Sequence, residues 1–503
     1  MVIRRISRAV RLHKLDRALD RAESYAQWQE IAAEHDQLSG AEEWRAGDDT
    51  ELLHSGELRR SLDTLRKMRA EGETWALSKY LQEVLFRHQG ELIQPEIYQI
   101  AKLGTKHVVT ELLDEIEACF HYLIELDTPE VDDTYRLEQT KRIGRVYGRP
   151  ALMLSGGALL GLFHFGVIKA LFDENLLPRT ISGSSMGAIM AGWACVHSDE
   201  ELRGLFADLS QINCQALTRL PLREALAQRT IMDQPKLLAF LKTVMGDHTL
   251  AEAMKRSGRV LNITVSPLHV RQTPRLINYL SAPEALINHA VLASCAVPMV
   301  FKPVQLMARR RGKVTPWMED ELWVDGSVNG DLPFDLLRQM LNINHFITSQ
   351  ANPHVVPLLS FYGNRTGVSA SLTRAASNIA LKSSAELLDL ARRHVPGQTL
   401  RNSLAKAYAV SNQTYAGNDM HVQLPFRPKL YAKVLNNPSL DEFKAYVRMG
   451  EQATWPRLPM IRDRTRLSRM FGTAIGTLMR RMEQNSSPRA KTPRNPPRRK
   501  PVT

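Results

Sequence analysis

The feature that most constrains the fold of this chain is an uncharged run of 19 residues, Pro150–Ile168, which is interrupted by a pair of glycines. Ala151–Leu154 is a short apolar run of the kind that forms a buried strand, and Ser155-Gly156-Gly157 follows it. Apolar side chains then recur at helical spacing at Leu159, Leu162, Phe163, Val167, Ala170 and Leu171. A membrane-spanning helix is the alternative, but the glycine pair and His164 disfavour it. The run therefore predicts a strand, a turn and a helix of an α/β core.

The glycine turn has a chemical meaning as well as a structural one. A turn that enters a helix amino terminus directs backbone N–H groups outward, which suits a phosphate or a developing oxyanion. A phosphate-binding loop is disfavoured because Gly161 is followed by Leu162-Phe163 instead of Lys and Ser or Thr. A dinucleotide fingerprint is excluded by the spacing of the glycines. The turn therefore favours oxyanion stabilisation.

A serine lies about thirty residues further on, in the pentapeptide Gly183-Ser184-Ser185-Met186-Gly187. The β-prone run Thr180–Ser182 precedes it, and a helix rich in small residues, Met186–Val196, follows. Glycines two residues to either side of Ser185 permit the sharp turn that exposes a nucleophilic hydroxyl at a strand end. The pentapeptide alone occurs by chance in long chains, so its weight depends on its companions.

The third motif is an aspartate at the end of another short strand. Trp323-Val324 is followed by Asp325-Gly326, a turn-rich segment at 327–331 and a helix that opens at Pro333. Taken alone, Asp325 would be an ordinary turn residue. Because it follows the glycine turn and the serine motif in order, we interpret it as the partner of Ser185.

Together these motifs resemble the patatin-like phospholipase family over about residues 149–365. In that family Gly-x-Ser-x-Gly and Asp-Gly-Gly/Ala supply a serine–aspartate dyad. The chain departs from the family pattern at Ala158, Leu160 and Ser327, where a glycine, a basic residue and a Gly or Ala are usual. In these departures it is similar to the fungal and plant triacylglycerol lipase branch, whose members also carry a helical region before the patatin domain.

The resemblance implies an α/β fold, a three-layer α/β/α domain with a central, mostly parallel sheet, preceded by a helical domain and followed by helices. It implies a lipid acyl hydrolase that acts on acylglycerol or phospholipid without a metal or cofactor. A burial that desolvates the aspartate would make it a stronger base. The implied site residues are catalytic Ser185 and Asp325, oxyanion-hole Gly156, Gly157 and Ala158, and the supporting glycines Gly161, Gly183, Gly187 and Gly326.

Two alternatives to hydrolysis remain open at this level. Acyl transfer to a lysolipid or acylglycerol would use the same acyl-enzyme and differ only in the acceptor. A non-enzymatic lipid-surface protein is disfavoured because the motif residues are intact. We expect His164 to be a packed core residue and assign no catalytic role to His345 or His354. The four cysteines show no paired spacing and are expected to be reduced.

The formal net charge of +13 is concentrated at the two ends of the chain. Residues 457–503 hold 13 Lys or Arg and two acids, and apolar residues recur at helical spacing between Leu467 and Met482. Such a basic amphipathic helix either lies on an anionic membrane or lipid-droplet surface or docks on the protein's own body. From Ser486 onward the Pro/Arg-rich sequence predicts disorder, and no nucleic acid is expected because interleaved aromatics are absent.

The domain organisation follows from these patterns. We predict a basic arm at 1–14, a helical domain at 15–148, the catalytic domain at 149–365, a helical region at 366–453, and a basic amphipathic and disordered tail at 454–503. The amino terminus lacks the apolar core of a secretory signal, so a cytoplasmic, peripherally lipid-associated protein is expected. Head group, acyl length, positional preference and oligomeric state are not determined by the sequence.

Overall fold

The computed structural model describes residues 2–47, 52–92, 94–126, 132–268, 274–326, 332–353, 355–356, 420–431 and 434–486. Several predictions from the sequence fall elsewhere. Ser327, His354, residues 366–419 of the predicted helical region and the segment after Ser486 lie outside the described residues.

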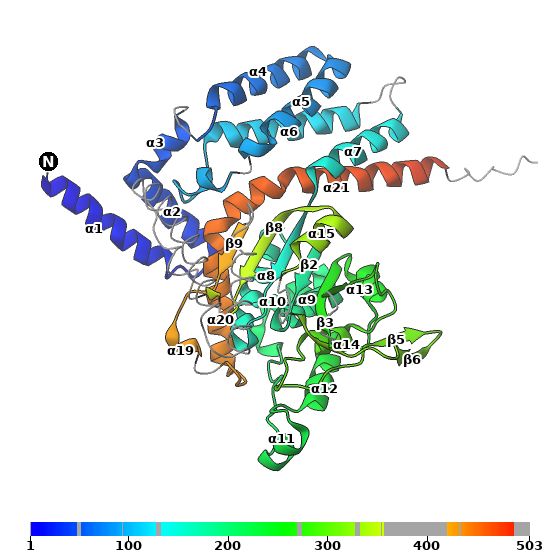
Figure 1. The fold of residues 1–503 in the computed structure, drawn as a ribbon. Helices are drawn as coiled ribbons and strands as arrows, with labels where there is room; N and C mark the ends of the chain where they lie inside the picture. The colour runs from blue at the N-terminus through cyan, green and yellow to red at the C-terminus, as the bar shows by residue number, and fades with distance from the viewer. Residues whose placement is uncertain are drawn as a thin grey trace, which may run out of the picture.

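The amino-terminal part of the chain is helical, as predicted (Figure 1). Leu58, Leu62 and Leu65 of one helix are buried, and they face buried residues of the helix His107–Glu125. Residues 2–14 of the predicted basic arm lie within the first helix, which continues to Leu19. The helices are α1 (Val2–Leu19), α2 (Tyr25–Ser39), α3 (Ala41–Ala46), α4 (Ser55–Glu71), α5 (Thr74–Leu92), α6 (His107–Glu125) and α7 (Asp133–Tyr147), with a 3₁₀ turn at Pro95–Tyr98.

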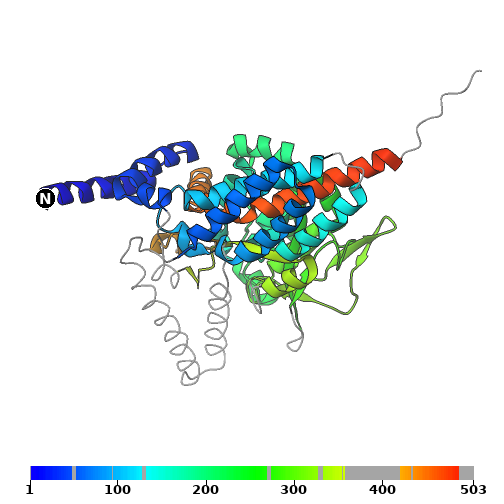
Figure 2. The ribbon, with the colours of Figure 1, turned by 90° about the horizontal axis from the view of Figure 1, so that it is seen from above.

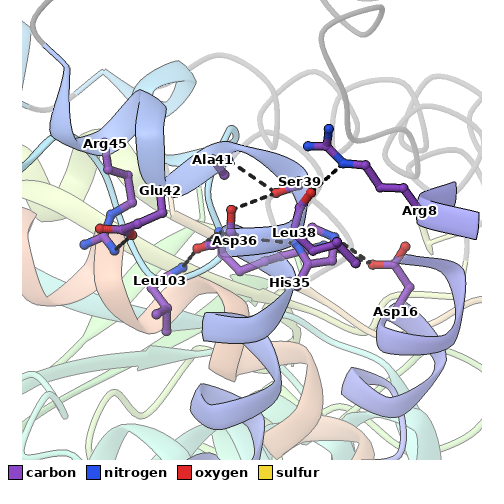
Figure 3. A network of polar contacts seen from close by, with 11 residues as sticks. Arg8, Asp16, His35, Asp36, Leu38, Ser39, Ala41, Glu42, Arg45 and Leu103 are labelled. Atoms are coloured by element: carbon purple, nitrogen blue, oxygen red, sulfur yellow. Dashed lines mark hydrogen bonds and ion pairs between the residues drawn. The ribbon is translucent and has the colours of Figure 1, made fainter. Parts of the chain in front are cut away.

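A buried carboxylate ties the loop before α6 to α2 (Figure 3). Asp36 is 1% exposed and accepts hydrogen bonds from the backbone N–H groups of Lys102, at 2.9 Å, and Leu103, at 3.0 Å. His35 lies beside it, 3.5 Å from the carboxylate and 3.6 Å from Asp16 of α1. Since buried carboxylates require such partners, this contact fixes the α5–α6 connection against the first two helices.

A mostly parallel sheet follows, in the order β4-β3-β2-β1-β8-β9, with β7 also paired to β3. The pairs β1–β2, β1–β8, β2–β3 and β8–β9 are parallel, whereas β4 and β7 run antiparallel to β3. The strands are β1 (Arg149–Leu154), β2 (Thr180–Gly183), β3 (Val260–Pro267), β4 (Arg275–Ile277), β7 (Trp323–Asp325), β8 (Ile343–Gln350) and β9 (Met420–Gln423); β5 (Met307–Arg310) and β6 (Lys313–Pro316) form a separate hairpin.

Helices cover both faces of this sheet, which confirms the predicted three-layer architecture. Along β1, Leu152 and Leu154 belong to the main core with α8 and α9, whereas Ala151 and Met153 pack with residues of α15. The helices of this part are α8 (Phe163–Asp173), α9 (Met186–Val196), α10 (Asp199–Ala207), α11 (Leu222–Gln228), α12 (Gln234–Met245), α13 (Leu250–Ser257), α14 (Ile287–Ser294), α15 (Phe334–Leu341), α19 (Pro428–Tyr431), α20 (Leu440–Thr454) and α21 (Leu458–Ser486).

The uncharged run is therefore divided among β1, a turn and α8. Among the described residues, none of the helices combines the length and apolarity that a membrane crossing requires.

The central sheet continues beyond residue 365, the predicted end of the catalytic domain. Strand β9 adds a further parallel strand beside β8, and α20 packs on α8. The α8–α20 contact is close because both helices present glycine. A Cβ atom at Gly166 would lie 1.9 Å from the carbonyl oxygen of Val447, and one at Gly450 would lie 2.3 Å from that of Phe163. The described residues of the region 366–453 thus add a strand to the sheet and a helix to the layer that covers it.

The helix α21 shows which alternative holds for the amphipathic tail. It lies alongside α7 in both ribbon views (Figures 1 and 2), and Leu467, Phe471 and Leu478 are at most 2% exposed. The Phe471 ring meets Phe120 of α6 edge-on at 5.2 Å between centroids. Arg466 of α21 forms an ion pair with Asp114 of α6 at 2.6 Å. Of the two alternatives, docking on the protein's own body therefore holds for this apolar stripe, because α6 and α7 cover it.

A buried acid in α21 predicts a pH-dependent stability. Asp463 accepts a hydrogen bond from Tyr98 at 3.1 Å, and burial raises its pKa to about 6, against the opposing effects of Tyr98 and nearby arginines. The pKa of Asp463 in the folded protein therefore exceeds its value of about 3.9 in the unfolded chain, so the folded state binds the proton more tightly. The resulting contribution to the free energy of unfolding is complete below about pH 3.9 and is lost as pH rises through 6. Asp463→Asn should remove this dependence, so its stability relative to wild type should rise by up to about 3 kcal/mol between pH 4 and 7. Denaturant titrations across this range measure the difference, and parallel pH profiles for the two proteins would contradict it.

Candidate active site

The predicted site residues converge at the carboxyl ends of β1 and β2. The two strands pair in parallel with Leu154 opposite Gly183, so the glycine turn and the serine motif leave the sheet side by side. The N–H of Ser184 donates to the carbonyl of Leu154 at 3.2 Å, which joins the two turns directly. This edge of a parallel sheet is where open α/β folds position their ligands.

Ser185 occupies a strained position between β2 and α9. Its backbone has φ 52° and ψ −121°, a conformation that non-glycine residues rarely adopt, and its side chain is partly exposed. A Cβ atom at Gly183 would lie 2.2 Å from the carbonyl oxygen of Gly187, and one at Gly187 would lie 2.3 Å from that of Leu154. The two glycines of the motif are therefore required by contact with neighbouring backbone, as a tight nucleophile turn demands.

A second serine, whose role the sequence analysis did not predict, supports this turn. Ser294, the last residue of α14, accepts a hydrogen bond from the Ser185 N–H at 3.0 Å and donates one to the carbonyl of Thr264 at 2.8 Å. It is fully buried. Ser294 therefore ties the strained backbone of Ser185 to β3, a contact across 109 residues of sequence.

The glycine turn approaches the sheet closely before it enters the helix α8. A Cβ atom at Gly157 would lie 2.8 Å from the carbonyl oxygen of Ala351, and one at Gly161 would lie 2.5 Å from Cγ of Met186. Ala158 has φ 46° and is partly exposed, so this position where the family usually has glycine keeps a left-handed conformation. Within the described part of the chain, the N–H groups of Gly157 and Ala158 have no hydrogen-bond acceptor.

His164 holds the same turn from inside the core. It is fully buried, one ring nitrogen lies 2.7 Å from Ser349 Oγ, and the other lies 3.0 Å from the carbonyl oxygen of Ser155. Burial lowers the pKa of His164 to about 4, so the ring is neutral at pH 7. These contacts confirm the prediction of a packed core histidine. His345 lies at the amino end of β8, 3.0 Å from the carbonyl oxygen of Tyr147, far along the strand from the site.

Asp325 reaches the same edge through β7. Val265 of β3 pairs with Arg275 of β4 on one side and with Asp325 on the other. Because β2 occupies that second side up to Gly183, opposite Ile263, Asp325 lies in line beyond the end of β2. This is the direction in which the chain continues to Ser185.

The surroundings of Asp325 are dry and closely packed. The residue is fully buried, and its N–H donates to the carbonyl of Ala296 at 3.1 Å. A Cβ atom at Gly326 would lie 2.3 Å from the carbonyl oxygen of Thr264, so glycine is needed where the chain leaves β7 beside β3. Burial and the charge of Asp325 together raise the pKa of the Cys295 thiol well above its usual range, so that thiol stays protonated.

An apolar cavity of about 230 Å³ opens beside these turns. Its lining begins at Leu159, two residues after Gly157, and at Met186, directly after Ser185. Further lining comes from α8, α9, α10, α12, α20 and the segments around 211–217 and 436–438, including Phe165, Met190, Trp193, Leu205, Phe240 and Phe443. A cavity of this composition suits a hydrocarbon chain.

Known proteins and family models resemble this chain in two regions. Residues 152–338 match the family described as patatin-like phospholipase, and residues 5–145 match a domain of unknown function, DUF3336. The chain is 31% identical to triacylglycerol lipase 5 of Saccharomyces cerevisiae over 88% of its own length and 62% of the relative's. It is 32% identical to triacylglycerol lipase 4 of the same yeast over 94% of its own length and 54% of the relative's. Among solved structures, VipD from Legionella pneumophila aligns with a TM-score of 0.29 and 14% identity, covering 60% of this chain and 67% of that one.

The chain therefore combines a patatin-like phospholipase domain, at residues 152–338, with an amino-terminal DUF3336 domain, at residues 5–145. It spans less than two thirds of the length of either yeast relative.

Proposed function

We propose that this protein is a lipid acyl hydrolase that releases fatty acids through an acyl-enzyme on Ser185. The observation that carries the proposal is the position of the apolar cavity, whose lining begins immediately after Ser185 and after the glycine turn. An acyl chain in that cavity would present its ester carbonyl between the serine hydroxyl and the N–H groups of Gly157 and Ala158. Binding of the acyl chain would then position the ester carbonyl for attack by the serine hydroxyl.

In the first half of the reaction, Asp325 accepts the proton of the Ser185 hydroxyl as Oγ attacks the ester carbonyl. The N–H groups of Gly156, Gly157 and Ala158 stabilise the oxyanion that forms. When the intermediate collapses, the bond to the alcohol oxygen breaks and the leaving alkoxide takes the proton from Asp325. The burial of Asp325 favours this role, because a desolvated carboxylate holds a proton more readily than one in water.

In the second half, water replaces the alcohol. Asp325 accepts a proton from the water molecule as the water oxygen attacks the acyl carbonyl. The same oxyanion site stabilises the second tetrahedral intermediate. The bond to Ser185 Oγ then breaks, the serine recovers its proton from Asp325, and the fatty acid leaves. The two carboxyl-end turns and one carboxylate are sufficient for both halves.

For the substrate we propose a neutral acylglycerol, with phospholipid as the comparison. The support is the names of the yeast relatives, both triacylglycerol lipases. Leu160, at the position where the family usually carries a basic residue, is fully buried. That position therefore offers no cation to an anionic head group.

The test is fatty-acid release from a triacylglycerol emulsion and from phosphatidylcholine vesicles in parallel, with and without prior treatment by a fluorophosphonate. We expect release that the label abolishes, with the label recovered on Ser185. Addition of a lysolipid acceptor, followed by analysis of all acylated products, separates hydrolysis from acyl transfer. Absence of labelled Ser185 and of release from both lipids would overturn the proposal.

The cavity gives a prediction for chain-length preference. Ala216 is 9% exposed and lines the cavity, so Ala216→Phe should occupy the space of several methylene groups. We expect kcat/KM for a long-chain ester to fall about tenfold or more, with that for a butyrate ester changed by less than about twofold. Ala207→Phe, on the exposed end of α10, adds the same volume outside the cavity and is the matched control. Equal losses on both ester lengths would argue against an acyl cavity.

A further inference from the structure

The helix α11 is largely exposed to solvent. None of its residues from Leu222 to Gln228 is buried, and it projects from the lower end of the molecule in Figure 1. Leu222 is 77% exposed and Leu226 is 72% exposed. Since residues four apart share a helix face, these two leucines form one apolar tip turned toward solvent.

Two paired segments, residues 218–220 and 231–233, hold the tip and are called the neck. Leu220 donates its N–H to the carbonyl of Ile231 at 2.9 Å, and Asp233 donates to that of Thr218 at 2.8 Å, so the chain enters and leaves as a short antiparallel pair. The helix ends at Arg229, which adopts a left-handed conformation and donates to the carbonyl of Ala225. The exposed leucines are therefore presented in a defined conformation.

The neck connects the tip to the candidate active site. Leu217, directly before it, lines the cavity. On the other strand, the N–H of Met232 donates to the carbonyl of Val300 at 3.1 Å. Val300 follows Met299, which is 78% exposed, and the same segment begins at Ala296, the backbone partner of Asp325. We call the exposed apolar side chains of these two segments the apolar prong: Leu222, Leu226, Ile231, Val297 and Met299.

The charges around the prong select its partner. Between Thr218 and Asp233 the chain carries Arg219, Arg223 and Arg229 against a single acid, Glu224, and all three arginines are on the exposed neck or helix. Apolar residues bordered by arginine suit an anionic lipid surface, where the apolar groups enter the acyl region and the cations remain among the head groups. A stable protein interface needs about 20–30 residues a side, so five side chains are too few for one.

We propose that the apolar prong inserts into the surface of a lipid phase that carries anionic head groups and holds the cavity against it. The proposal rests on the proposed lipid hydrolase function, because a water-insoluble ester must pass from that surface into the cavity. It also assigns lipid contact to a different part of the chain from α21, whose apolar stripe is covered. In Figure 1, α11 lies below the sheet and α21 above it. Leu217, next to the base of the α11 segment, lines the cavity, whereas the described lining includes no residue of α21.

The test compares Leu222→Gln/Leu226→Gln with Val146→Gln/Met479→Gln, a control pair of 49% and 44% exposed residues on α7 and α21. Both are made in a Ser185→Ala background, so that binding is measured without turnover. The probe is a triolein emulsion coated with phosphatidylcholine, with or without about 30% phosphatidylserine. We expect the prong pair to lower partitioning to the anionic emulsion by about tenfold or more, and the control pair to leave it within about twofold.

With Ser185 restored, the prong pair should lose emulsion hydrolysis to a similar degree while its turnover of a soluble butyrate ester stays within about twofold. Unchanged partitioning of the prong pair would overturn the proposal, whether or not the protein hydrolyses lipid. Equal binding with and without phosphatidylserine would overturn its electrostatic part. A change in oligomeric state without a change in partitioning would identify the prong as a contact between copies of this chain and would likewise overturn it.

Discussion

Ser185→Ala is expected to lower fatty-acid release by about 10⁴-fold or more while leaving the fold intact. Without Oγ no acyl-enzyme forms, and the oxyanion donors and the cavity alone supply only weak catalysis. The strained φ of 52° at Ser185 belongs to a backbone fixed by Gly183, Gly187 and Ser294, so alanine can occupy the same position. Release is measured on the preferred lipid and on a soluble ester, with circular dichroism and thermal unfolding to confirm folding.

The adjacent serine provides the control. Ser184 is fully buried, and its hydroxyl has no hydrogen-bond partner in the described part of the chain. Ser184→Ala should therefore retain activity within a few-fold of wild type and should still be labelled by a fluorophosphonate. Full activity in Ser185→Ala, or loss of labelling only in Ser184→Ala, would remove Ser185 from the mechanism.

The motif glycines were predictable from sequence because their constraint is local. Gly183 and Gly187 are required by carbonyl oxygens only 2.2 and 2.3 Å from a Cβ position, and such contacts recur wherever a strand turns sharply into a helix. The parallel strands were predictable for a similar reason, because a short apolar run beside a glycine turn has few alternatives to a buried strand. The architecture therefore followed from patterns within about ten residues.

Contacts made across long sequence separations were not predictable. Ser294 supports Ser185 over 109 residues, and a buried serine at a helix end carries no sequence signal of such a role. Strand β9 is four residues long and follows a long segment without a strand pattern, so it was missed. In both cases the role depends on a partner distant in sequence, the Ser185 backbone for Ser294 and strand β8 for β9.

The amphipathic helix α21 shows a different limit. Its apolar stripe and flanking arginines are equally compatible with a lipid surface and with a protein surface that offers acids. Asp114 and Glu117 of α6 supply those acids to Arg466, and Phe120 supplies an apolar partner. The pattern specifies that one face is buried but not what buries it. By contrast, α11 is too short to give a periodic signal, and its exposure became evident only in the fold.

Asp325→Asn tests the remaining catalytic assignment, and the loss of activity should be about 10³-fold or more. Asparagine keeps the size of the side chain but cannot accept the serine proton. The position should tolerate it, because β7 is held by backbone contacts: the N–H of residue 325 donates to Ala296, and the strand pairs with β3 at Val265. Folding should therefore be retained while acylation fails.

Two measurements separate loss of the base from a general disturbance of the site. Partitioning to the anionic emulsion should be unchanged in Asp325→Asn, because the apolar prong does not depend on the carboxylate. Asp463→Asn is the same substitution at another buried acid, on α21 beside Tyr98, and should retain full activity. If Asp325→Asn kept more than about a tenth of wild-type kcat, another group would have to accept the proton from Ser185, since a base acting in the transition state contributes at least about 10²-fold. If instead only Asp325→Asn is inactive while it still binds lipid, the carboxylate is the base and the dyad is complete.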